Sequence, residues 1–556
     1  MRFFAQLQCI LFAALAVLPG MAAATAPCDV ATFERLGLPQ TTFTLVESLP
    51  AGAHPQPVGT IEAPICRVRG VFAPENVFEV WLPTGEWNRK YQGVGNGGLA
   101  GSITYSDLRA AVARGYATSS TDTGHDSNAA TDPWWTDAQP IKDYGYRSIH
   151  ETAVRSKAII KAFYRKSISK SYFNACSTVG RQAFMEAQRY PDDYDGIIAG
   201  APVYRVIDLR ARHVNTWQCN HLDSTGARAI PTSKLRPIFE AVVAKCDAID
   251  GLVDGQIDDP RRCNFDPASI QCAGADDGRC LTAAQVETFR CIYRGATDLN
   301  TGKLLYPGPP LGSELDEAQN IGSAPNTQYT TFFANTVFQN PAYDFRTFRF
   351  DVDVALSMNK RYGGETLEFI HHAESVDLRK FAKRGGKMII WHGWSDPLPQ
   401  AKDTIAYYER VGKFFDENTR GRDKTDVEDV ARLFLLPNVG HCGGGSAGGP
   451  NTWDPLTALE QWVEDGVAPK QIVASRVNSG VVVRTRPICA YPMRAHYKGR
   501  GSIDEAANFV CKEDRKGRDD DDHDHGHGHG HGHGHDRDHD RDDHGHGHGH
   551  GHDRDD

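Results

Sequence analysis

Residues 171–184 read SYFNACSTVGRQAF, a strand-like run followed by Ser177 and a helix-like continuation. A strand, a tight turn and a helix around a serine form a nucleophile elbow, whose usual pattern is G-x-S-x-G. In this chain Ala175 and Val179 occupy the two glycine positions. The segment therefore predicts either a variant elbow in a fold that alternates strands and helices, or an ordinary buried serine. The rest of the sequence decides between them.

Short apolar runs alternate with helical patterns on both sides of this segment. Strands are expected at residues 77–83, 90–98, 116–122, 171–176, 195–202, 387–393 and 432–440, and helices at 148–164 and 403–415. Such runs, bounded by Gly, Pro and Asp and separated by helices, predict a mostly parallel sheet in an α/β fold. The alternation stops between about residues 206 and 384, where we expect an inserted lid over the carboxyl ends of the strands.

The N-terminus has the pattern of a secretory signal peptide. Residues 1–24 combine Arg2, an apolar run and small residues, with a cleavage site expected near Ala24. The TAPC sequence before Cys28 is a poor lipoprotein site, and no later segment reaches about 18 uninterrupted apolar residues. We expect an exported chain, secreted or periplasmic, without a membrane span. Its catalytic domain comprises residues 25–205 and 385–515, the lid 206–384 and a tail 516–556.

Composition indicates a globular protein with a polar tail. The 556 residues are 40% hydrophobic, enough for a large core. Much of the acid behind the net charge of −10 lies in the tail, so the charge argues only weakly against nucleic acid as a partner. The tail also holds 13 of the 23 histidines, mostly alternating with glycine. This pattern predicts disorder and binding of zinc, nickel or copper.

Two later residues complete a catalytic triad with Ser177. A serine is a weak nucleophile and needs a base that is itself oriented by a carboxylate. Asp396 follows the apolar run at 387–393, and His441 follows the run at 432–440. Both positions fall at the carboxyl ends of expected strands, where α/β folds place their chemistry. We predict Ser177 as nucleophile, His441 as base and Asp396 as the acid.

Cysteine placement supports this site. Of the 13 cysteines, removal of the signal peptide with Cys9 leaves an even number, which indicates disulfides in an oxidising compartment. Cys176 directly precedes Ser177, and Cys442 directly follows His441. A disulfide holds its α-carbons about 4.4–6.8 Å apart, so a bridge here would bring nucleophile and base together.

An acyl-transfer site also needs hydrogen-bond donors for an oxyanion. The amide after the nucleophile, that of Thr178, is the first candidate. The glycine-rich stretch GVGNGGLAG at residues 93–101 supplies the second, from Gly98 or, as the close alternative, Gly97.

Several of these segments resemble a known family. CSTVGRQAFMEAQRYPDDYDGIIAGAP (176–202), STDTGH (120–125), HGWSDPL (392–398) and GHC (440–442) are similar to the tannase and feruloyl esterase family of α/β-hydrolases, whose members include a mono(2-hydroxyethyl) terephthalate hydrolase. The resemblance runs from about Cys28 to Cys511. It implies an α/β-hydrolase fold with a large lid, bridged cysteines beside the triad, and esters of aromatic acids as substrates. Proximity or this resemblance suggests further disulfides at Cys28–Cys66, Cys246–Cys263, Cys272–Cys280 and Cys489–Cys511, while Cys219–Cys291 follows only by elimination.

A second motif, CDAIDGLVDGQIDDPRRC, lies between Cys246 and Cys263. Carboxylates in a glycine-containing loop suit calcium, although the spacing is not that of an EF-hand. We expect a structural calcium site with Asp247, Asp250 and Asp254 as ligands. The resemblance implies that Leu252 and Gln256 add their carbonyl oxygens.

The sequence is best interpreted as a secreted serine esterase for small-molecule esters of aromatic acids. The alternative is an exported metal-binding protein with an inactive hydrolase domain and a functional His-rich tail, which Ala175 and Val179 keep open. Glycine is favoured at position 179 because helix and strand approach closely there. Val179 must be housed by a wider elbow, which would displace the amide of Thr178, or by local repacking.

Overall fold

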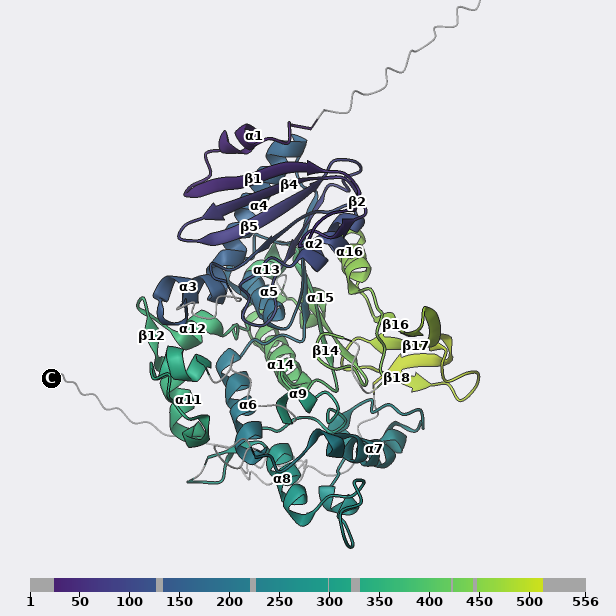
Figure 1. The fold of residues 1–556 in the computed structure, drawn as a ribbon. Coiled ribbons are helices and arrows are strands. Elements are labelled where there is room, and N and C mark those ends of the chain that lie inside the picture. The colour runs from purple at the N-terminus through teal and green to yellow at the C-terminus, as the bar shows by residue number, and fades with distance from the viewer. Residues whose placement is uncertain are drawn as a thin grey trace, which may run out of the picture. The chain divides into compact units, whose positions relative to one another are not determined.

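A sheet of nine strands forms the centre of the computed structural model (Figure 1). The structure describes residues 25–126, 134–220, 227–298, 300–321, 331–421, 424–443 and 448–513. The expected signal peptide (1–24) and His-rich tail (516–556) lie outside the described residues. In spatial order the strands are β1 (Thr41–Leu49), β4 (Ile65–Phe72), β5 (Asn76–Pro83), β7 (Ala117–Thr121), β6 (Lys90–Val94), β8 (Lys170–Cys176), β9 (Gly196–Gly200), β14 (Lys387–Gly393) and β15 (Ala431–Leu436).

The sheet is parallel from β7 to β15 and antiparallel at one edge. β7, β6, β8, β9, β14 and β15 pair in parallel, whereas β1, β4 and β5 join through antiparallel pairs. Every residue of β7 and of β9 is buried, as expected for central strands covered on both faces. The predicted α/β fold is therefore confirmed, with an added antiparallel edge that includes two strands before residue 77.

Helices cover both faces of the sheet (Figure 1). Side chains alternate along a strand, so Tyr172 and Phe173 of β8 enter different cores. α4 (Ser148–Tyr164), α5 (Thr178–Arg189) and α14 (Ala401–Asn418) pack on the side of Phe173, and α2 (Tyr105–Ala113) and α16 (Pro455–Asp465) on the other. The expected helices at 148–164 and 403–415 are confirmed.

The long insertion between β9 and β14 is mostly helical and has apolar cores of its own. It contains α6 (Val206–Asn220), α7 (Leu235–Cys246), α8 (Ala283–Arg294), α9 (Ala318–Ile321), α11 (Phe350–Asn359), α12 (Leu367–His371), α13 (Arg379–Lys383), and the short strands β10 (Ala296–Thr297), β11 (Leu304–Tyr306), β12 (Arg361–Tyr362) and β13 (Glu365–Thr366). Asp316 of this insertion lies close to Gly440, since a Cβ atom at Gly440 would be only 2.8 Å from Asp316 Oδ2. The insertion therefore packs directly against the loop that carries His441.

The remaining elements are short or lie near the C-terminus. They are α1 (Val30–Glu34), β2 (Gly52–Ala53), β3 (Thr60–Ile61), α3 (Ala138–Lys142), α15 (Val427–Val430), β16 (Gln471–Asn478), β17 (Val481–Cys489), β18 (Arg494–Tyr497) and β19 (Phe509–Lys512). None of the helices in the described ranges is both long and apolar enough to cross a membrane.

Six disulfides join the described parts of the chain. They pair Cys28–Cys66, Cys176–Cys442, Cys219–Cys291, Cys246–Cys263, Cys272–Cys280 and Cys489–Cys511. Every expected pair is confirmed, including the one reached only by elimination.

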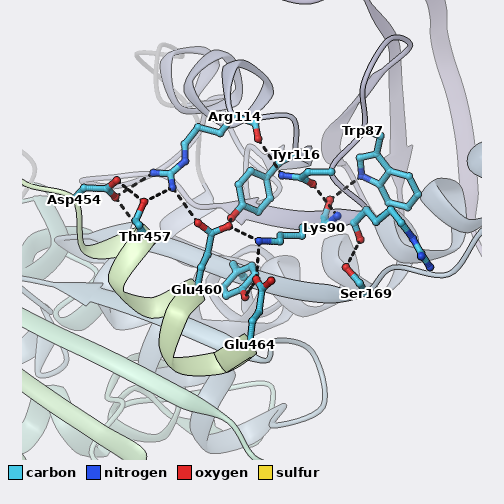
Figure 2. Close-up of polar contacts among 12 residues, drawn as sticks. Trp87, Lys90, Arg114, Tyr116, Ser169, Asp454, Thr457, Glu460 and Glu464 are labelled. Carbon is cyan, nitrogen blue, oxygen red and sulfur yellow. Dashed lines mark hydrogen bonds and ion pairs between the residues drawn. The ribbon is translucent and has the colours of Figure 1, made fainter. Parts of the chain in front are cut away.

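A charged network fixes α16 to the sheet (Figure 2). Glu460 accepts hydrogen bonds from Lys90 Nζ at 2.8 Å, from Arg114 at 3.1 Å and from the Tyr116 hydroxyl. Lys90 also lies 2.6 Å from Glu464, one turn further along the helix. Because the side chain of Glu460 is only 18% exposed, these bonds are partly shielded from water. Glu460 therefore links β6, the C-terminal end of α2 and α16.

We expect Glu460→Gln to lower the free energy of unfolding by about 1–3 kcal/mol, because three donors lose a charged acceptor. Urea denaturation followed by circular dichroism measures this loss. Asp465→Asn is the matched control, since Asp465 is an exposed residue at the end of the same helix. Equal unfolding midpoints for the two variants would show that the network contributes nothing to stability.

Candidate active site

Ser177 occupies a sharp turn between β8 and α5. Its φ of 74° and ψ of −129° lie outside the regions that most residues adopt, a strain that costs about 1–3 kcal/mol. The Ser177 amide donates to Gly200 O at 2.9 Å, and its carbonyl accepts from the Val203 amide at 3.2 Å. The neighbouring strand β9 and the residues after it thus hold the turn. This geometry is that of a nucleophile elbow.

His441 and Asp396 extend from this serine in a line of hydrogen bonds. His441 Nε2 lies 2.7 Å from Ser177 Oγ, and His441 Nδ1 lies 2.7 Å from Asp396 Oδ2. Asp396 follows β14 and is completely buried, whereas His441 follows β15 and has a side chain 36% exposed. Both loops leave the carboxyl edge of the sheet, as expected. The structure therefore brings together the three residues that the sequence singles out.

The charges at the site favour a basic histidine. Burial lowers the pKa of His441, but the charge and hydrogen bond of Asp396 raise it, and the net pKa lies above its usual value. Burial raises the pKa of Asp396, while His441 and His392 lower it below the usual range. His392 Nε2 lies 3.3 Å from Asp396 Oδ2 and is completely buried. His392 was not among the site residues expected from the sequence, although it belongs to the HGWSDPL segment.

The disulfide Cys176–Cys442 joins the residues next to the nucleophile and the histidine. Its α-carbons are 5.7 Å apart, although the cysteines are 266 residues apart in the sequence. Ser395, next to Asp396, donates its amide to Val439 O at 3.0 Å, which ties the aspartate loop to the histidine loop. The three loops of the site are therefore fastened to one another covalently and through the backbone.

The two expected oxyanion residues also meet. Thr178 is the first residue of α5, so no carbonyl within the helix can accept a bond from its amide. The Thr178 hydroxyl donates to Gly98 O at 2.8 Å, and the Tyr144 hydroxyl donates to the same oxygen at 3.2 Å. Gly97 O accepts from the Ala100 amide at 2.9 Å. These bonds fix the orientation of the two peptide groups that flank Gly98.

Val179 is housed by Gly95, a residue of the glycine-rich stretch. A Cβ atom at Gly95 would lie 2.3 Å from Val179 Cγ1 and 2.3 Å from Gln182 Oε1. The helix α5 approaches the strand β9 closely at Gly180, one residue after Val179. A Cβ atom at Gly180 would lie 2.4 Å from Gly200 O. Val179 is therefore buried by local repacking, and the partner that accommodates it is Gly95.

The acidic loop between Cys246 and Cys263 has a folded backbone. Asp247 accepts from the amides of Asp254 and Gly255 at 3.0–3.2 Å, and Asp250 accepts from the Leu252 amide at 2.9 Å. Arg486 of β17 forms an ion pair with Asp254. The three expected carboxylate ligands thus lie in one folded segment, where Asp247 and Asp250 accept amides of the loop and Asp254 pairs with Arg486.

The electrostatics of this loop fit a cation. Burial, together with the charges of Asp254 and Asp247, raises the pKa of Asp250. Burial and the charge of Asp250 raise the pKa of Asp258 to about 7. Burial and neighbouring carboxylates thus both disfavour the charged form of these two groups, and carboxylate oxygens are hard ligands that suit calcium. Asp258 was not among the residues expected from the sequence.

In the described ranges three groups of side chains have ligand atoms close enough together to share a metal, and the carboxylates of the acidic loop are not among them: Cys272, Asp276 and Cys280; His150, Glu186 and Asp193; and Asp208, His372 and Glu374. The two cysteines of the first group form a disulfide. Lys157 lies 3.8 Å from Asp193, and Arg205 lies 2.7 Å from Asp208. Cations of the protein itself thus already face the other two groups, as Arg486 faces Asp254 in the acidic loop.

Comparison with known proteins identifies the relatives of this chain. The family model described as tannase and feruloyl esterase matches residues 59–512. An uncharacterized esterase from Xanthomonas campestris pv. campestris is 36% identical, over 91% of this chain and 94% of that protein. A probable feruloyl esterase B-2 from Aspergillus terreus is 32% identical, over 81% of this chain and 87% of that protein.

Two solved structures are also similar to this chain over most of its length. Feruloyl esterase B from Aspergillus oryzae superposes with a TM-score of 0.77 at 27% identity, covering 87% of this chain and 99% of that one. Tannin acyl hydrolase from Aspergillus niger superposes with a TM-score of 0.72 at 21% identity, covering 88% and 95%. The second likeness shows that the fold is shared.

We expect Gly95→Ala to displace Val179 and Gln182, because a methyl group has no room between them. Overpacking of this kind costs about 1–3 kcal/mol, and a shift of α5 would move the amide of Thr178 and lower kcat by about 10-fold or more. Gly274→Ala, at an exposed position of the insertion, is the control, since nothing lies within 4 Å of a Cβ there. Steady-state kinetics and melting curves of both variants test this, and a Gly95→Ala protein indistinguishable from the control would refute the packing argument.

Proposed function

The chain belongs to the tannase and feruloyl esterase family and is a carboxylic ester hydrolase, and we propose that it is an exported serine esterase that uses Ser177, His441 and Asp396. One observation carries the proposal: two hydrogen bonds of 2.7 Å run from Ser177 Oγ through the His441 ring to Asp396. A hydroxyl at a strained elbow, with a base in direct contact and a buried carboxylate behind it, is the arrangement that activates serine.

Acylation begins when Ser177 Oγ attacks the ester carbonyl carbon and His441 Nε2 takes the hydroxyl proton. Asp396 holds the ring with Nδ1 protonated and stabilises the positive charge that develops on it. The carbonyl oxygen becomes an oxyanion, for which the amides of Thr178 and Gly98 are the proposed donors. The intermediate collapses when its bond to the alcohol oxygen breaks, and His441 returns the proton to the departing alcohol.

Deacylation repeats these steps with water. His441 removes a proton from the water, which attacks the acyl carbon bonded to Ser177 Oγ. The second oxyanion uses the same two amides, and its collapse releases the acid and returns the proton to Ser177. Because the pKa of His441 lies above its usual value, the ring is a stronger base than a free imidazole.

The proposed substrates are small-molecule esters of aromatic acids. The named feruloyl esterases and tannin acyl hydrolase among the relatives support this class. An aromatic cluster also reaches the oxyanion loop: Tyr144 bonds to Gly98 O, Trp134 lies 5.2 Å from Tyr144, and the half-buried Trp135 stacks on Trp134 at 4.0 Å. Trp134 and Tyr144 are buried, so Trp135 is the ring of this cluster that can offer an apolar surface to a flat acyl group.

Export is supported by the six disulfides, which persist in oxidising compartments. The intact geometry around Ser177 disfavours an inactive hydrolase domain. Binding of zinc, nickel or copper by the tail remains a prediction.

We further propose that the acidic loop holds a structural calcium ion. Asp247, Asp250 and Asp254 would supply carboxylate oxygens, and Leu252 and Gln256 their carbonyls. Burial, together with the charges of Asp254 and Asp247, raises the pKa of Asp250, and a bound cation would favour its charged form, which supports this assignment. The ion would stabilise the turn and take no part in the chemistry.

Hydrolysis of an ester panel by the wild type and Ser177→Ala tests the proposed function. The panel contains the methyl esters of a hydroxycinnamic acid and of gallic acid, a monoester of terephthalic acid, and methyl acetate as the non-aromatic ester. Members of a triad act as a unit, so we expect Ser177→Ala to lower kcat by about 10⁴-fold or more. The control is Ser167→Ala, at an exposed serine after α4. A Ser177→Ala variant that kept the wild-type rate would show that Ser177 is not the nucleophile. A wild type that preferred the acetate ester would contradict aromatic acids as the substrate class.

Removal of calcium should lower the melting temperature of the full chain. A ligand present at about 100 times its Kd stabilises the native state by about 2.7 kcal/mol. Melting curves are recorded with a calcium-selective chelator and with excess calcium, for the wild type, Asp250→Asn and Asp277→Asn. Asp277 accepts amide bonds in another disulfide-bounded acidic turn and serves as the control. We expect a calcium-dependent shift in the wild type and in Asp277→Asn and none in Asp250→Asn; a wild type without a shift would contradict the site.

A further inference from the structure

Asn438 lies three residues before the catalytic histidine in an unusual conformation. Its φ of 52° is left-handed, a region that asparagine tolerates better than most residues other than glycine. Its side chain is almost fully buried, with 1% exposed. A glycine would satisfy the backbone at this position equally well, so the side chain calls for a separate explanation.

The amide of Asn438 bonds on both sides to the acidic loop. Its Oδ1 accepts from the Ile257 amide at 3.0 Å, and its Nδ2 donates to Gly255 O at 2.8 Å. The Gly255 amide donates in turn to the carboxylate of Asp247 at 3.0 Å. Hydrogen bonds on either side of Gly255 therefore connect Asp247 with the loop that carries His441.

The backbone next to Asn438 also locks the aspartate loop. Val439 O accepts the amide of Ser395, the neighbour of Asp396. A Cβ at Gly393 would lie 2.0 Å from Val439 O, so the two loops touch without any room between them. A displacement at residues 438–439 would consequently reach both His441 and Asp396.

We propose that Asn438 is a positioning residue that couples the acidic loop to the catalytic histidine. The proposal rests on the function proposed above. Asn438 is not the sole attachment of the acidic loop, because Arg486 pairs with Asp254 and the Arg484 side chain donates to Asp254 O at 3.2 Å. Loss of its side chain therefore affects the placement of His441 more than the folding of the loop.

The first test is Asn438→Gly, which keeps the left-handed backbone and removes both side-chain bonds. Steady-state kinetics use the ester that the wild type hydrolyses fastest. We expect kcat to fall about 10-fold with KM within about twofold, because small misplacements of a catalytic group cost rate more than binding. The control is Ser479→Gly, which makes the same kind of change at an exposed position with φ of 48° in the turn between β16 and β17. Its kcat should equal that of the wild type.

The second test is a double-mutant cycle with Asp247→Asn, with kcat and the melting temperature as separate readouts. We expect the two changes to be non-additive in kcat, since both interrupt the same series of bonds. An Asn438→Gly enzyme with wild-type kcat, or strictly additive losses in the cycle, would overturn the proposal. A loss of kcat that only follows a lowered melting temperature would also overturn it. A wild type that hydrolyses no ester of the panel would instead contradict the proposed function.

Discussion

The left-handed backbone of Ser177 is the constraint on which the rest of the structure depends. Its strain has to be compensated by contacts that leave the turn no alternative. β9 provides one such contact, because Gly200 O accepts the Ser177 amide. The start of α5 provides another through the close approach of Gly180 to Gly200. The disulfide Cys176–Cys442 adds a covalent bond from the strand to the histidine loop. In the sheet β9, β14 and β15 follow β8 in that order, so the same sheet that strains the serine also delivers Asp396 after β14 and His441 after β15.

Much of the fold could be predicted from the sequence because its central strands and helices have patterns that can be recognised within a short stretch of chain. β14 and α4 coincide with the expected ranges 387–393 and 148–164, since a buried parallel strand is a short apolar run and an amphipathic helix has its own period. Of the antiparallel edge, β5 was expected at residues 77–83 but β1 and β4 were not; β1 is mostly partly exposed and alternates irregularly. The hairpins of β16 to β19 were missed for a related reason: several of their valines, such as Val481 and Val482, face solvent, so no apolar run predicts a packed element.

The candidate site divides in the same way. Ser177, Asp396 and His441 could be found because each follows a recognisable strand in a short motif. His392, Tyr144 and Asn438 could not, because each acts through a contact with a residue distant in the sequence or through a ring whose orientation only the fold sets. Asp258 was missed because only burial beside Asp250 distinguishes it from an ordinary surface carboxylate.

The contact between Gly95 and Val179 has an evolutionary consequence. The two positions share space for a single side chain, although they belong to separate motifs and lie 84 residues apart in the numbering of the chain. A lineage can therefore acquire a branched residue at position 179 only while position 95 remains without a β-carbon. The order in which such substitutions accumulate is then restricted. Transfer of either motif alone into a relative would separate Val179 from the glycine that accommodates it.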